Sequence, residues 1–207
     1  MTAHSATLLN VVAGRADDRV VTRAIRVASV LFITVLTAAA AQISFPLPFT
    51  QVPFTFQPLV VLVGGLILGS RLGCASQVLY LSAGIAGLPV FAASATLPPA
   101  LFRLLGPTGG YLMAYPFAAF VVGDLAERGF ARRYVTSVAA MLVGLAIIYA
   151  SGTLWLAYFA RFASGSAAIG LSAALSSGVY PFVAADLAKL LAAAGITPGL
   201  WRLVGPR

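Results

Sequence analysis

Long apolar runs, separated by short polar, proline-rich or arginine-containing segments, make up most of the sequence. Runs of this length and hydrophobicity are typical of helices that enter a bilayer. They predict helices over residues 23–42, 57–70, 73–87, 109–125, 135–159 and 178–195. The second run is short, and the last carries two charged side chains. The pattern therefore predicts an all-α integral membrane protein with six transmembrane helices.

Prolines mark the longest connections between these runs. Residues 44–58 cannot form one continuous helix, because prolines recur through the segment, and its phenylalanines favour a loop packed at the membrane surface. Residues 88–108 contain four more prolines, and loops of this length in a compact fold are usually functional. Residues 161–177 either extend the last helix upstream or form a separate loop or short helix. We favour the second reading, because Pro181 suits a first helical turn and Ser176 or Ser177 could cap it.

The ends of the chain differ from the apolar middle. Residues 1–22 are polar and predict a cytoplasmic tail, residues 23–199 the membrane domain, and residues 200–207 a second tail. The start of the first run also resembles a signal peptide. A retained helix is favoured, because a long segment precedes the run and the following chain is itself apolar. Within the membrane domain, Gly65, Gly69 and Gly73 form a small-residue face that allows close helix approach.

Composition agrees with a membrane protein. The chain is 60% hydrophobic and 9% charged, with mean hydropathy +0.98, whereas soluble domains are about 25% charged. The net charge of +8 does not indicate nucleic-acid binding, because the arginines lie between apolar runs rather than on one face. A single cysteine, Cys74, excludes an internal disulfide and offers no metal cluster.

The arginines predict an orientation in the cell (cytoplasmic) membrane. With the N-terminus inside, only Arg103 and Arg161 fall on the outer side, and the other ten arginines fall inside. Six spans return the C-terminus to the cytoplasm. The two proline-rich loops and the start of the last helix are then expected on the outer side.

Asp186 and Lys189 are the most informative residues. Lys189 is the only lysine, and it lies three residues after the acid, so both side chains project from one helical face. A charge near a bilayer centre costs at least about 2.5–3.5 kcal/mol, so such charges usually face an interior or a cavity. They are candidates for a functional site. The alternative is that they only pair with each other or join helices.

Further polar and aromatic residues are expected on the outer side, and together they suit a small anionic ligand with amide-like groups. Lys189 or Arg103 could bind a carboxylate, Asp186 could accept paired N–H donors, and aromatic side chains could wall an apolar ring. The remaining candidates are Gln57, Thr108, Tyr111 and Trp155. The alternatives are membrane-interface positions for Trp155 and Tyr111, a headgroup anchor for Arg103 and a helix cap for Gln57.

The string GPTGGYL, residues 106–112, is the most distinctive in the chain. Gly109 and Gly110 permit backbone conformations closed to other residues, and Pro107 stiffens the approach. The string is expected to form a tight turn that lets backbone meet ligand. An ordinary helix entry is the alternative.

Several strings in order, VPFTFQPLVVLVGGLILG, GLPVF, GPTGGYL, GTLWLA and PFVAADLAKLLAAA, resemble the BioY family, the biotin-binding S components of energy-coupling factor transporters. The resemblance implies a six-helix bundle with an outward-facing biotin pocket. It also implies coupling to a transmembrane T component and two cytoplasmic ATPases. It implies that Asp186, Lys189 and Tyr111 belong to the ligand site; around Arg103 the match is weaker. A small-residue partner face on the first helix fits either Ala24/Ala28 or Thr34/Ala38, and we favour the second pair because it lies deeper in the span.

Absent motifs narrow the function further. A P-loop needs Gly-Lys followed by Ser or Thr, and the sole lysine follows Ala188, so any ATPase must be another chain. We therefore expect no cofactor on this chain and no enzymatic activity. An S component for another vitamin remains an alternative. So does a membrane enzyme acting on a lipid-like substrate, although we find no clustered carboxylates, no nucleophile–base pair and no histidine at membrane depth.

Overall fold

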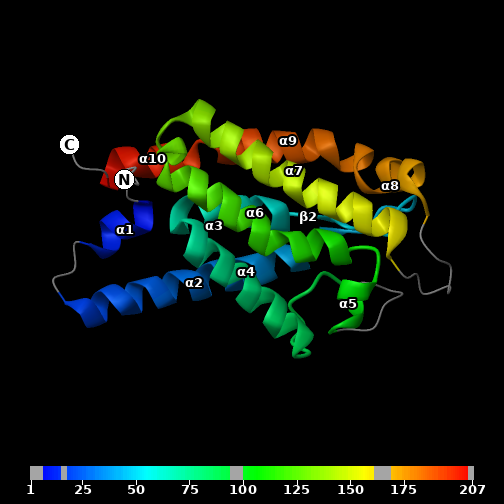
Figure 1. Ribbon diagram of the computed structural model, residues 1–207, viewed down its shortest axis with the longest axis horizontal. Coiled ribbons are helices and arrows are strands. Elements are labelled where there is room, and N and C mark those ends of the chain that lie inside the picture. Colours follow the sequence, from blue (N-terminus) through cyan, green and yellow to red (C-terminus); the bar gives the residue numbers. More distant parts are fainter. Residues whose placement is uncertain (1–6, 15–17, 94–99, 161–168, 205–207) are drawn as a thin grey trace.

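The computed structural model describes residues 7–14, 18–93, 100–160 and 169–204, and helices form most of it (Figure 1). The long helices are α2 (Arg19–Gln42), α3 (Gln57–Leu68), α4 (Ser70–Ile85), α6 (Gly109–Glu127), α7 (Tyr134–Tyr158) and α9 (Tyr180–Ala193). The short ones are α1 (Leu8–Ala13), α5 (Phe102–Leu105), η1 (Phe130–Arg132), α8 (Leu171–Gly178) and α10 (Ile196–Val204). Strands β1 (Ser44–Phe45) and β2 (Phe54–Thr55) pair antiparallel.

Each predicted helix corresponds to one of the six long helices, because the apolar runs and the prolines and glycines between them mark the boundaries. Within the described residues, four stretches are long and apolar enough to cross a membrane: Arg19–Gln42, Gly109–Glu127, Tyr134–Tyr158 and Tyr180–Val204. Helix α3 is apolar but shorter. The turn between α3 and α4 lies at Gly69. This glycine has φ +86°, a conformation that favours glycine.

Short helices lie within both segments that the sequence predicts as tails. Helix α1 buries Leu8 and Leu9 and contacts α2, α3 and α10, so part of the 1–22 segment packs on the bundle. Helix α10 likewise takes up part of the segment expected to be the C-terminal tail. In Figure 1, α1 and α10 lie together at one end of the molecule, and α5 and α8 lie at the opposite end.

At the centre of the bundle, α6 packs on α3, α4 and α7. The glycine face predicted from residues 65 to 73 serves this packing. A Cβ on Gly65 would lie 2.8 Å from the carbonyl oxygen of Ala119 in α6, so only a glycine allows this approach.

The last long helix begins differently from the prediction. Pro181 does lie in its first turn, but the N-cap is Val179, and Ser176 and Ser177 instead bond to the carbonyl of Ala173 within α8. Helix α8 shows that residues 171–178 form a separate short helix; residues 161–168 lie outside the described part of the chain.

The predicted partner face on the first helix is corrected at Thr34. This side chain is 9% exposed, and its hydroxyl donates to the carbonyl of Ser76 in α4 at 2.9 Å. Ala38 is half-buried and packs against the core. Ala24 and Ala28, the alternative pair, are both exposed.

Candidate functional site

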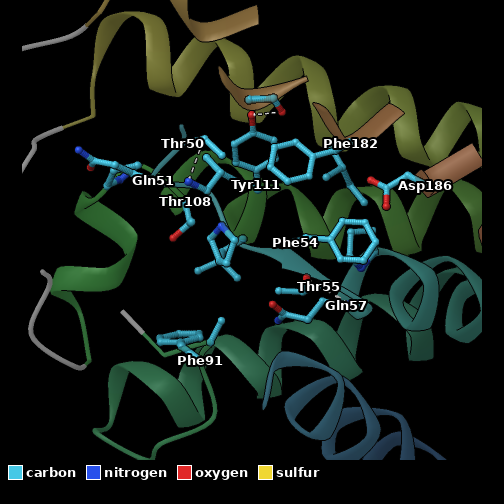
Figure 2. A pocket seen from close by; sticks show the side chains of 18 of the residues that line it. Thr50, Gln51, Phe54, Thr55, Gln57, Phe91, Thr108, Tyr111, Phe182 and Asp186 are labelled. Atoms are coloured by element: carbon cyan, nitrogen blue, oxygen red, sulfur yellow. Dashed lines mark hydrogen bonds between the residues drawn. The ribbon is translucent and has the colours of Figure 1, made fainter. Parts of the chain in front are cut away.

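A hollow of about 290 Å³ opens between the β1–β2 hairpin and helices α3, α5, α6, α7 and α9 (Figure 2). Its size is close to the lower end of the range for small-molecule pockets, roughly 300–1,000 Å³. Much of one wall is the hairpin, which contributes residues 50–55. In Figure 2, Asp186 lies beside Phe182 and Phe54, and Thr50 and Gln51 lie on the opposite side of the hollow.

The structure brings together most of the residues selected from the sequence. Five of them line the hollow: Gln57, Arg103, Thr108, Tyr111 and Asp186. Lys189 lies next to Asp186 but is not among the residues that line this hollow. Trp155 is not among them either.

Asp186 is held by a donor on each carboxylate oxygen. Its side chain is 9% exposed, Oδ1 pairs with Lys189 Nζ at 2.5 Å, and Oδ2 accepts the Tyr149 hydroxyl at 2.6 Å. The pairing alternative considered for Asp186 and Lys189 is thus present, yet the same carboxylate also borders the hollow. A carboxylate has about four lone-pair sites, so two remain for N–H donors of a ligand.

The two candidate cations have different surroundings. Lys189 also donates to the Thr55 carbonyl at 2.8 Å and lies 4.0 Å from the centre of the Phe54 ring. Arg103 lines the hollow from α5, and partial burial lowers the pKa of its guanidinium, which nevertheless stays charged at neutral pH. Of the two, Arg103 is therefore the one placed to meet an anionic group inside the hollow.

Gln57 is buried and fixed by a neighbouring tyrosine. Its amide nitrogen donates to the Tyr80 hydroxyl at 2.7 Å, and that hydroxyl donates to the Val90 carbonyl at 3.2 Å. One of the two amide N–H groups is thereby used, and the amide oxygen can accept a hydrogen bond from a ligand.

The GPTGGYL string enters α6, and its glycines serve close packing rather than an unusual backbone conformation. Both are helical, and a Cβ on Gly109 would lie 1.8 Å from the Leu104 carbonyl oxygen. A Cβ on Gly110 would likewise collide with Trp155. The expectation of a special backbone conformation at these glycines is therefore wrong, and what they approach is protein.

Two aromatic residues fasten segments around the site. The Trp155 indole donates to the Gly106 carbonyl at 2.9 Å, and the Tyr111 hydroxyl donates to the Gly178 carbonyl at 2.8 Å. Trp155 thus holds the start of the GPTGGYL string. Tyr111 both lines the hollow and joins α6 to the end of α8.

Sequence reasoning missed Tyr149, Phe54 and Phe182. Phe54 and Phe182 stack with ring centroids 6.4 Å apart, and both line the hollow. A tyrosine hydroxyl deep in the apolar run 135–159 is a signal that could have found Tyr149, because a buried hydroxyl needs a partner. The two phenylalanines carry no such signal among the many aromatic residues of the chain.

Comparison with known proteins shows similarity in sequence and in fold. The BioY family model matches residues 11–206. The chain is 38% identical over 167 residues to the probable biotin transporter BioY of Pyrococcus horikoshii, covering 81% of this chain and 90% of that one. It is 37% identical over 170 residues to the biotin transporter BioY of Thermotoga maritima, covering 82% and 92%. Its fold is similar to a crystal structure of the S-component for biotin from an ECF-type ABC transporter. The TM-score is 0.76 at 23% identity, over 90% of this chain and 95% of that one. The resemblance seen in the sequence is confirmed.

Proposed function

Because the chain belongs to the BioY family, we propose that it is an S component that captures biotin and delivers it with an energy-coupling factor ATPase module. The observation that carries this proposal is the buried Asp186 carboxylate, which borders a small hollow and has acceptor sites to spare. The biotin transporters among its relatives support the choice of vitamin.

The groups around the hollow suit the three parts of biotin. The cyclic urea has two N–H donors for Asp186 and a further polar edge for Gln57 or Thr108. The apolar bicyclic ring fits against Phe54, Phe182 and Tyr111. The valerate carboxylate is matched by Arg103, whereas Lys189 contributes through Asp186. Trp155 supports the site through the loop that it holds.

The setting in the membrane follows the arginine distribution. We infer six spans in the cytoplasmic membrane, with both termini inside and the hollow facing outward. A T component and two ATPase subunits supply the energy, because the single lysine of this chain excludes a P-loop. The exposed Ala24 and Ala28 in α2 offer a small-residue face for the T component. The chain itself carries no cofactor and no enzymatic activity.

Calorimetry on the purified protein in detergent tests the proposal. Biotin is expected to bind saturably and tightly, and thiamine and riboflavin are expected to give no heat. Binding of another vitamin instead of biotin would make the chain an S component of different specificity. If none of the three vitamins bound, the hollow would no longer support the proposed function.

A further inference from the structure

Lys189 contacts the hairpin wall of the hollow rather than the hollow itself. Its ammonium donates to the Thr55 carbonyl at 2.8 Å and pairs with Asp186. It also lies 4.0 Å from the centre of the Phe54 ring and 5.1 Å from that of Phe56. The charge therefore connects helix α9 with the β2 end of the hairpin, and its side chain is only 12% exposed.

The hairpin has little to hold it in shape by itself. Strands β1 and β2 share two residue pairs, Ser44 with Thr55 and Phe45 with Phe54. An isolated two-stranded hairpin is marginal in stability even when longer than this. Two sets of contacts therefore keep this wall in place from α9: those of Lys189 and the stacking of Phe54 on Phe182.

We propose that Lys189 is a positioning residue that fastens the hairpin wall to the ligand-binding carboxylate of Asp186, and that it does not bind the ligand's own carboxylate. Its donors point to protein acceptors, and Arg103 is the cation that borders the hollow. One charged group thereby sets both the orientation of the Asp186 carboxylate and the position of β2. The part of this proposal that concerns the ligand rests on the proposed function.

The test of the fastening needs no ligand. Hydrogen exchange of the amides of residues 44–55 is measured in the ligand-free protein for the wild type and for Lys189→Met, which keeps the length of the side chain and removes its charge. Loss of a charged hydrogen bond is expected to speed exchange in this segment about tenfold or more. Lys189→Arg is expected to restore slow exchange, because it keeps a donor and the charge. Unchanged exchange in Lys189→Met would overturn the proposal.

A matched control separates this effect from general loosening. Trp155→Phe removes a similar bond from a helix side chain to a loop carbonyl, that of Gly106. It is expected to speed exchange near residues 102–108 and to leave residues 44–55 unchanged. Equal acceleration of both segments in both variants would contradict a specific fastening by Lys189. If Lys189→Met cannot be purified in folded form, Lys189→Gln is used, with the same expectation.

The kinetics of ligand dissociation test the second part of the proposal, that Lys189 does not bind the ligand's carboxylate. With biotin, Lys189→Met is expected to raise the dissociation rate about tenfold while the preference for biotin over its uncharged primary amide is kept. Loss of that preference would show that Lys189 binds the carboxylate and would refute this half. If the wild type binds no biotin, the proposed function fails, and the exchange experiment still decides whether Lys189 fastens the hairpin.

Discussion

Replacing Asp186 by asparagine is the most direct test of the site, because it removes one charge and almost no volume. The carboxylate is 9% exposed and receives donors from Lys189 and Tyr149. Truncating one partner of a buried charged hydrogen bond costs about 2–5 kcal/mol in binding, which corresponds to an affinity loss of roughly 30- to 4,000-fold. The change also leaves the Lys189 ammonium without its counter-charge, so a lower free energy of unfolding is expected as well, by about 3–5 kcal/mol.

The chain offers a matched control. Asp124 near the end of α6 pairs at 2.6 Å with Arg128, the residue that follows this helix, but the two side chains are 29% and 61% exposed. An exposed pair contributes about 0–1 kcal/mol, so Asp124→Asn should leave both stability and biotin affinity nearly unchanged. Titration calorimetry gives the dissociation constants, and thermal unfolding in the same detergent shows whether each variant is folded. A folded Asp186→Asn protein whose dissociation constant changes less than about twofold would refute the reasoning.

Three further predictions follow from neighbouring residues. Arg103→Gln should abolish the preference for biotin over its amide, and calorimetry with both ligands checks this; a retained preference would place the carboxylate elsewhere. Tyr149→Phe removes the donor to Oδ2 and should weaken biotin binding roughly 10- to 100-fold; the same change made in Asp186→Asn should have almost no further effect, and additive losses would argue against an action through Asp186. Gly109→Ala forces a Cβ against the Leu104 carbonyl and should lower the free energy of unfolding by about 1–3 kcal/mol, whereas Gly199→Ala in α10, where a Cβ meets nothing within 4 Å, should not destabilise; equal melting temperatures would contradict the packing argument.

The helices could be predicted because apolar runs and prolines act locally. Residue 57 starts α3 and residue 109 starts α6, as the predicted ranges have it. The rotation of a helix about its axis was harder to predict from the sequence. Small and apolar residues occur on every side of helix α2, so the sequence could not tell that Thr34 faces α4 while Ala24 and Ala28 face outward.

The acid and lysine of the last helix could be selected because charges in an apolar run have few structural uses. Their distinct tasks could not be predicted. Lys189 donates its hydrogen bond to a backbone carbonyl. A carbonyl is present at every residue, so the residue type at position 55 does not indicate this bond. The special backbone conformation expected at Gly109 and Gly110 was wrong. A glycine can be needed either for its conformational freedom or for close packing, and the sequence alone does not distinguish the two reasons.

The segments bordering the hollow share one construction. Lys189, Trp155 and Tyr111 each reach across from a helix to the carbonyl oxygen of residue 55, 106 or 178. Any amino acid supplies that oxygen, so a side chain such as that of residue 55 is free to differ as long as the main chain keeps its course. Residue 178 is the exception, because a Cβ there would lie 2.3 Å from the Tyr111 hydroxyl and disturb the bond. In such a scaffold, substitutions at residues that border the hollow can change which molecule it binds, while these bonds to the backbone keep the shape of the opening.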